Sequence, residues 1–170
     1  LTFYDTGADH ETLMIRPRES FDNAIPSGAS VACSVLLQIS VLTGEKHYHE
    51  VASKALESIT NLATQHPYGM GEWLGVLDFY VNKSNEVAII GNLEDPDGKA
   101  LLQVIYDKFL PHTVFAASMV GDPKGLDSSP ILKFRTKING KPSAYVCTNY
   151  SCQSPVTDPE DLAKQLEIRG

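Results

Sequence analysis

Long hydrophobic runs are what the sequence most clearly lacks. No stretch approaches the roughly 18 consecutive apolar residues of a membrane-spanning helix, and the start has no signal-peptide layout of charged and then apolar residues. Basic residues are also scarce: 14 Lys and Arg stand against 21 Asp and Glu, a formal net charge of -7, which disfavours nucleic acid and anionic membranes. We expect a soluble, cytoplasmic protein with no nucleic-acid or membrane partner. Because Leu1 begins in mid-pattern, we also expect a piece of a longer protein.

Cysteine is scarce as well, which excludes a disulfide framework. The three cysteines are Cys33, Cys147 and Cys152, and Cys33 falls in an apolar run where a small buried side chain is usual. Cys147 and Cys152 are separated by four residues, whereas two-cysteine redox motifs usually have two between them, and a zinc site would need two more ligands. The spacing favours a packed pair of free thiols and leaves a disulfide or a labile metal site as alternatives. No metal site and no cofactor is predicted.

The hydrophobic periodicity predicts a helical first part and a mixed second part. Helices are predicted over 31–42, 46–65 and about 68–81, and strands over 86–91, 113–118 and 143–147. The segment 31–42 is apolar at most positions, so we expect burial nearly all round. Gly44 is expected to end this helix with a left-handed backbone. Between the first two strands, a helix is predicted from the spacing of Leu101, Leu102, Val104, Ile105 and Phe109, which gives a βαβ unit with a parallel strand pair. Thr157 or Asp158 is suited to cap a C-terminal helix.

These elements predict a mainly α protein with a small α/β unit. Residues 1–84 form the helical segment and residues 85–170 the α/β appendage, which ends in a helix, with the boundary near Lys83 to Asn85.

Short motifs typical of hydrolases occur but lack their structural context. Asp5-Thr6-Gly7 resembles the active-site turn of aspartic proteases, yet predicted helices follow where that all-β fold needs strands, so this activity is excluded. His49-Glu50 lacks the second histidine of a zinc-protease helix, since Ser53 stands in its place. The segment 28–32 half matches a nucleophile elbow but has no strand before it, so Ser30 is interpreted as a helix-start residue.

The polar loop from Asp5 to Ser27 is the strongest candidate binding site. It leads directly into the most apolar predicted helix, and in a ring of helices such a loop lies at the rim of the central cavity. Carboxylates and an arginine at a rim suit acid/base chemistry on a polyol. We predict Asp22 and Arg16 as catalytic residues and Asp5, Asp9 and Ser27 as substrate-binding residues. The alternative is a solvated connection stabilised by ion pairs.

Two long segments carry a family resemblance. Arg16-Pro17-Arg18, Asp22 and the segment 26–30 precede a helix that ends in Leu-Thr-Gly, and the closing segment 144–166 contains both Cys147 and Cys152. Together they resemble thioredoxin-domain-containing proteins of the bacterial YyaL type and the animal spermatogenesis-associated thioredoxin-like proteins, along nearly all 170 residues. Ala29 replaces the Asn usual in that family, which weakens a catalytic role at the rim, and Arg18 replaces a usual Lys.

The resemblance implies an N-terminal thioredoxin-like domain followed by an (α/α)6 barrel like those of six-hairpin glycosidases. This chain would then supply the last barrel helices and a C-terminal appendage. The leading hypothesis is a barrel that binds or processes a carbohydrate, by fold analogy alone. The rival is a non-catalytic scaffold or redox partner, in which Cys147 and Cys152 exchange with the thioredoxin-like domain. A partial barrel would expose apolar helix faces, so we expect self-association of the isolated chain.

Overall fold

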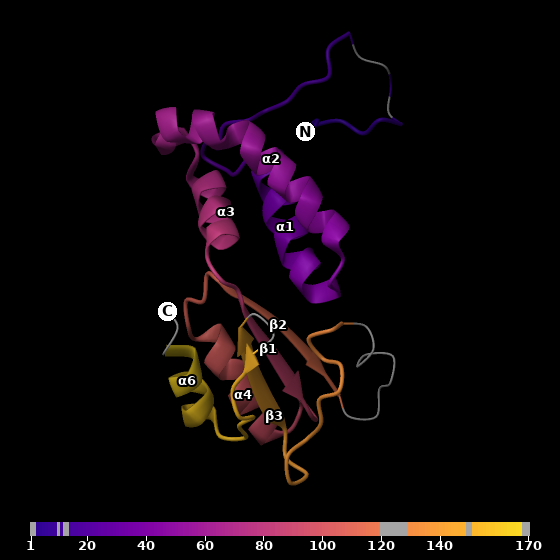
Figure 1. Cartoon of the computed structure of the whole chain (residues 1–170), viewed down its shortest axis with the longest axis vertical. Helices are drawn as coiled ribbons and strands as arrows, with labels where there is room; N and C mark the ends of the chain where they lie inside the picture. The colour runs from indigo at the N-terminus through magenta and orange to yellow at the C-terminus, as the bar shows by residue number, and fades with distance from the viewer. Residues whose placement is uncertain (1–2, 10, 12–13, 120–128, 149–150, 168–170) are drawn as a thin grey trace. The chain divides into compact units, whose positions relative to one another are not determined.

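The computed structural model describes residues 3–9, 11, 14–119, 129–148 and 151–167. The chain divides into two compact units, which are described separately (Figure 1). The first comprises residues 1–40 and 45–82, and the second comprises residues 41–44 and 83–170.

The first unit is helical. Its elements are α1 (Gly28–Thr43), whose last residues are assigned to the second unit, α2 (Lys46–Gln65), the 3-10 turn η1 (Pro67–Gly69) and α3 (Gly71–Val81). Cys33 and Leu37 of α1 pack with Leu56 of α2 and Trp73 of α3 in one buried core. Ala52, fully buried on α2, keeps the contact close enough for the Cys33 thiol to donate to its carbonyl at 3.5 Å.

The predicted helices of this unit are found, with corrections at two ends. The segment 46–65 forms one helix as predicted, and Gly44 has the expected left-handed backbone with φ 73°. The helix predicted at 31 begins earlier, at Gly28, because the Ser27 hydroxyl accepts the Ser30 amide N–H at 3.1 Å as an N-cap. The helix predicted from 68 begins at Gly71, after η1. Pro67 and Gly69 have low helix propensity, so this segment forms only a short turn.

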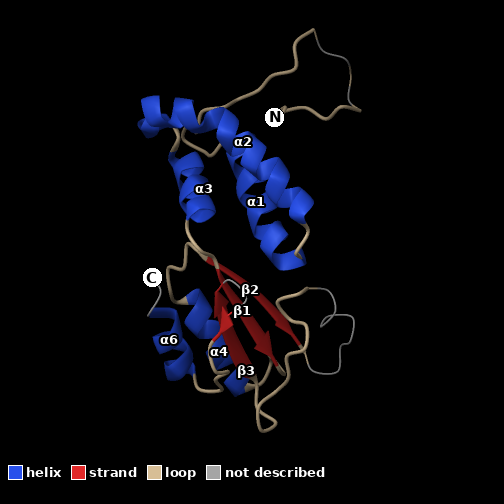
Figure 2. Cartoon of the chain, in the orientation of Figure 1, coloured by secondary structure: helices blue, strands red, loops and turns tan. Residues whose placement is uncertain are grey.

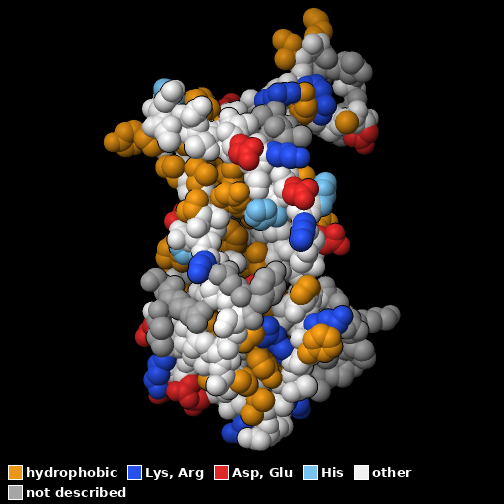
Figure 3. All heavy atoms as spheres, viewed as in Figure 1, with side chains coloured by type: hydrophobic (Ala, Val, Ile, Leu, Met, Phe, Trp, Pro, Cys, Tyr) orange, Lys and Arg blue, Asp and Glu red, His pale blue; other side chains and the backbone are white. Residues whose placement is uncertain are grey.

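Burial of α1 is one-sided, which corrects the prediction of burial nearly all round. Cys33 and Leu37 are buried, but Val31 and Val35 are 42% and 46% exposed. Most other positions of α1 are half-buried, so the exposed side of the helix is the one that carries Val31 and Val35. Figure 3 shows further hydrophobic side chains at the surface of the first unit.

The second unit is a four-stranded mixed sheet with helices (Figure 2). Its strands are β1 (Asn85–Ile90), β2 (Thr113–Ser118), β3 (Ser143–Thr148) and β4 (Ser151–Cys152), in the order β2-β1-β3-β4. Strands β1 and β2 are parallel, as predicted, with α4 (Pro96–Tyr106) between them in sequence. Strand β3, which was predicted, is antiparallel to β1 and to β4. Neither of these pairings, nor strand β4, was predicted from the sequence.

One face of this sheet is covered by α4 and by α6 (Pro159–Glu167). Val87 and Ile89 of β1 and Val146 of β3 pack there against Leu101 of α4 and Leu162 of α6. Because side chains alternate along a strand, Glu86, Tyr145 and Cys147 point to the opposite face. That alternation places Cys147, the first member of the candidate cysteine pair, away from the helix-covered core.

A side-chain cap marks the start of α6, whereas Asp95, the N-cap residue of α4, makes no side-chain cap hydrogen bond. Asp158 caps α6 by accepting the Glu160 amide N–H at 2.8 Å, so this cap prediction is confirmed. Helix α4 ends at Tyr106, and Phe109, predicted to lie on its apolar face, is outside the helix and 92% exposed. The helical spacing of the leucines and isoleucine therefore extends only to Ile105.

The fold thus combines five α-helices with a four-stranded mixed sheet within the described residues. The helices of this chain do not close into a barrel in the part that the structure describes. In that same part, no helix has both the length and the apolar character needed to cross a membrane.

Candidate functional site

Asp22 sits at the start of two helices and binds both. Its Oδ1 accepts the Ser27 amide N–H at 2.8 Å and the Ser30 hydroxyl at 2.7 Å. Its Oδ2 accepts the amide N–H of Trp73 at 3.1 Å, in the first turn of α3. One carboxylate therefore satisfies backbone donors at the N-termini of α1 and α3, which ordinarily lack partners within their own helices.

The electrostatics of Asp22 keep it ionised. Burial raises its pKa, but hydrogen bonds from the Ser27 amide, the Ser30 hydroxyl and the Trp73 amide act in the other direction and outweigh it. The net result is a pKa below the ordinary value for aspartate. A carboxylate in this state suits an electrostatic or structural role better than proton donation at neutral pH.

The other predicted site residues do not converge on Asp22, except Ser27. Ser27 is buried and joins Asp22 through its amide. Arg16 instead donates to the Thr6 carbonyl at 2.5 Å and lies over the Tyr4 ring at 3.9 Å. Asp5 accepts the Glu19 amide N–H at 2.8 Å, and Asp9 is exposed.

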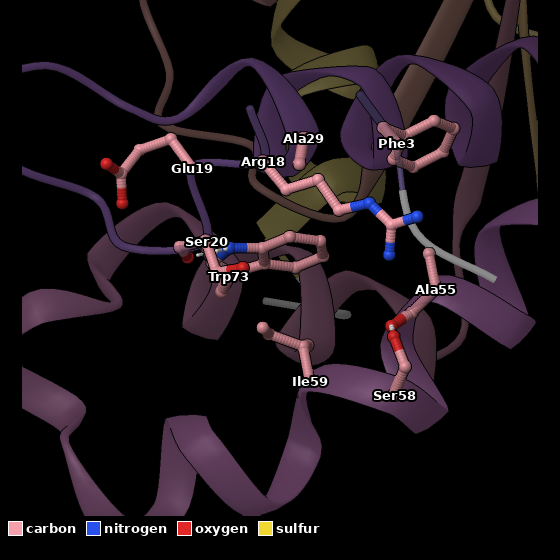
Figure 4. Close-up of a pocket in the computed structure, with 9 residues that line it drawn as sticks. All are labelled: Phe3, Arg18, Glu19, Ser20, Ala29, Ala55, Ser58, Ile59 and Trp73. Atoms are coloured by element: carbon pink, nitrogen blue, oxygen red, sulfur yellow. Dashed lines mark hydrogen bonds between the residues drawn. The ribbon is translucent and has the colours of Figure 1, made fainter. Parts of the chain in front are cut away.

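A small cavity lies between the polar loop and the helices (Figure 4). Its lining includes Arg18, Glu19 and Ser20 of the loop and the indole of Trp73, whose Nε1 donates to the Ser20 carbonyl at 2.9 Å. The cavity holds about 20 Å³, roughly the space of one water molecule. Trp73 was identified from the sequence only as a helix residue, because its meeting with Ser20 depends on tertiary packing.

A second cluster lies in the other unit, around Cys147 and Cys152. The two residues face each other across β3 and β4 and are joined by a disulfide. The prediction of a packed pair of free thiols is therefore wrong. The spacing in the sequence did not show that antiparallel pairing of β3 and β4 places the two cysteine side chains opposite each other. Cys147 is 1% exposed, whereas Cys152 is exposed at the sheet edge.

Arg135 places its guanidinium on this disulfide. Its Nη1 and Nη2 both lie 3.2 Å from the Cys147 sulfur, and Nη2 lies 3.8 Å from the Cys152 sulfur. The guanidinium carbon also lies 5.1 Å from the centre of the Tyr145 ring. Within the described residues, the buried Nε of Arg135 has no hydrogen-bond partner.

Glu86 completes the charges of the cluster. It stands directly opposite Cys147 in the β1–β3 register. Burial raises the pKa of Glu86, and the positive charge of Arg135 opposes that rise. Burial likewise lowers the pKa of Arg135, with Glu86 and Tyr145 opposing, and an arginine so placed still remains protonated at neutral pH.

The sequence did not identify Arg135 or Glu86. Arg135 lies in the segment before β3, where Phe134 has a left-handed backbone with φ 63°, and the β1–β3 register that brings Glu86 to Cys147 is set by tertiary structure. Cys33 is separate: burial raises the pKa of its thiol to about 11. Among the described residues no three His, Cys, Asp or Glu side chains are grouped to hold a metal ion.

Comparison with known proteins connects the chain to one group of relatives. It is 29% identical over 156 residues to human spermatogenesis-associated protein 20, covering 91% of this chain and 20% of that protein. The rat protein of the same name is 28% identical over 156 residues, and the mouse protein 28% over 164 residues. The chain is thus distantly homologous to these proteins and spans about a fifth of their length. No family model matches the chain, and no solved structure matches it significantly.

Proposed function

We propose that the Cys147–Cys152 disulfide is a thiol–disulfide exchange centre and that this chain is the redox partner of a dithiol protein. The observation that carries the proposal is the position of Arg135. Both of its terminal nitrogens lie against the Cys147 sulfur, and its Nε stays unsatisfied within the described chain. Disulfide sulfur is a weak acceptor, whereas a thiolate is an anion that a guanidinium stabilises, so Arg135 favours the reduced state.

The small loop that the disulfide closes also supports exchange over stapling. Cys147 and Cys152 are only 5 residues apart. In the loop-entropy account, a loop this short stabilises the fold by about 2 kcal/mol, at the low end for native disulfides. Reduction therefore costs the second unit little, and its core between the sheet and the two helices does not include the cysteines.

The family resemblance suggests which dithiol reacts. A thioredoxin-like domain within the same longer protein is the proposed partner, and its dithiol would reduce this disulfide through a mixed-disulfide intermediate. The barrel helices would then act as a scaffold that holds the two centres in one chain.

The test is reduction of the oxidised chain by a reduced thioredoxin-like protein, followed by rapid alkylation and peptide mass analysis. We expect Cys147 and Cys152 to become alkylated together on a scale of minutes. A disulfide that stays oxidised under these conditions, while a small dithiol in denaturant reduces it, contradicts the proposal.

A second candidate, carbohydrate binding, is favoured by the cavity beside Trp73. An indole together with Arg18 and Glu19 offers the stacking surface and charged partners that suit a polyol. The space of about 20 Å³ is too small for a sugar ring in this chain, so the proposal needs further helices to complete the site. The exposed apolar face of α1, with Val31 and Val35, supports such helices, as in an (α/α)6 barrel.

In this second proposal the ionised Asp22 holds the site together, and Arg16, Asp5 and Asp9 approach the ligand only in the complete barrel. Calorimetric titration of the full-length protein with a panel of monosaccharides tests it, with Arg18→Met as the variant and Lys54→Met on the exposed face of α2 as the charge-matched control. Loss of binding in Arg18→Met alone supports a sugar site here. Equal binding by both variants refutes it.

A further inference from the structure

Within the exchange centre, we infer that a protein dithiol attacks the Sγ of Cys152, that Cys147 leaves as a thiolate, and that Arg135 positions and stabilises this leaving group. This inference rests on the proposed exchange function and adds its direction. It depends on three described features: the exposure of Cys152, the burial of Cys147, and the side of the disulfide on which the guanidinium lies.

Access selects the sulfur that is attacked. A thiolate must approach a disulfide along the sulfur–sulfur axis, from behind the sulfur that it attacks. Cys152 is exposed on the edge strand β4, whereas Cys147 is 1% exposed on the inner strand β3. An incoming protein sulfur therefore reaches Cys152 first.

Charge selects the sulfur that leaves. Arg135 places two N–H donors at 3.2 Å from the Cys147 sulfur and one at 3.8 Å from the Cys152 sulfur. Exchange is faster when the leaving thiol is the better thiolate. The guanidinium stabilises negative charge most strongly on Cys147, so access and charge agree on the same direction of attack.

The chemical steps balance with a dithiol as the only co-reactant. The first partner thiolate forms a bond to Cys152 Sγ, the bond between Cys152 and Cys147 breaks, and its electron pair passes to Cys147 Sγ beside Arg135. The second partner thiolate then attacks its own neighbouring sulfur in the mixed disulfide and releases Cys152 as a thiolate, which takes up a proton. The partner ends as a disulfide and this chain as a dithiol, with two electrons transferred.

Other groups facing Cys147 set the strength of this effect. Glu86 lies opposite on β1, Tyr145 lies on the same face of β3, and Cys152 faces from β4. Glu86 interacts electrostatically with the Arg135 guanidinium and opposes thiolate formation through its own negative charge. Removal of that charge and removal of the guanidinium are therefore expected to have opposite effects.

The first experiment follows thiolate absorbance against pH in the Cys152→Ser variant of the full chain. Cys33 does not interfere near neutral pH, because burial raises its pKa to about 11. We expect a thiolate step that moves up by about one to three pH units when Arg135→Met is added. Arg135→Lys, which keeps the charge, should retain most of the effect, and Glu86→Gln should move the step down. If the thiolate step occurs at the same pH in the Cys152→Ser variant and in its Arg135→Met and Arg135→Lys derivatives, the proposed role of Arg135 is overturned.

The second experiment locates the mixed disulfide. The oxidised wild-type chain is incubated with glutathione, quenched with acid, and mapped by peptide mass. Glutathione on Cys152 supports the inference, and glutathione on Cys147 overturns the direction of attack. If no dithiol reduces the chain, the proposed exchange function fails, yet the pH titration still reports separately whether Arg135 stabilises a Cys147 thiolate.

Discussion

Replacement of Asp22 tests how one buried carboxylate holds the first unit together. Asp22→Ala removes the acceptors of the Ser27 and Trp73 amides, at the starts of two helices. Each lost cap costs about 0.5–2 kcal/mol, so we expect a loss of about 2–3 kcal/mol in the free energy of unfolding. Asp22→Asn keeps one acceptor oxygen but turns an N–H donor toward one of these groups, and should lose about 1–2 kcal/mol.

The assay uses the only tryptophan of the chain. Trp73 lies in the first unit, and its Nε1 donates to the Ser20 carbonyl, so its fluorescence in urea reports the unfolding of that unit. With a denaturant slope of about 1–2 kcal/mol/M, Asp22→Ala should lower the midpoint by about 1–3 M.

Asp9→Ala is the control, because it removes the same charge from an exposed position of the same loop. Its effect should stay within about 0.5 kcal/mol. A midpoint for Asp22→Ala that matches the one for Asp9→Ala would refute the double-cap account.

The pKa of Asp22, the disulfide and the exposed side of α1 can each be tested in solution. The pKa of Asp22 is lower in the folded state than in the unfolded state, so the stabilisation that Asp22 provides is complete above about pH 5 and is lost as the pH falls through the folded pKa. Acid unfolding followed by Trp73 fluorescence should therefore show a loss of stability in this pH range that the Asp22→Asn variant lacks. Thiol titration should find one free thiol, Cys33, in the denatured unreduced chain and three after reduction; three thiols without reductant would contradict the disulfide. Val31→Lys with Val35→Lys should reduce concentration-dependent self-association in sedimentation, because it places charge on the exposed apolar face of α1; unchanged association would place the contact elsewhere.

The elements that sequence reasoning predicted well are those fixed by local periodicity. The spacing of apolar residues in α2 and the short apolar run of β2 matched their observed bounds. Capping chemistry was also readable, as at Gly44 and Asp158. The start of α3 was less so, because its glycines and Pro67 give competing local signals.

What the sequence could not predict depends on contacts between distant residues. The β1–β3 register brings Glu86 to Cys147, and Asp22 reaches Trp73 across 51 positions. Arg135 gave no motif signal, since a single arginine before a strand is common. In the polar loop at 5–27, Asp22 caps two helices. The stronger candidate site is the disulfide, whose neighbouring residues are brought together only by the fold.

The reduction potential of the Cys147–Cys152 disulfide distinguishes an exchange centre from a structural disulfide. The oxidised chain is equilibrated in dithiol buffers of graded potential, quenched by alkylation, and the fraction of the disulfide reduced is measured by mass. We expect a midpoint above about -300 mV, within reach of cellular dithiols, and a more negative midpoint in Arg135→Met, because the guanidinium favours the thiolate. A midpoint well below about -300 mV, unchanged by Arg135→Met, would mark the disulfide as structural and contradict the account.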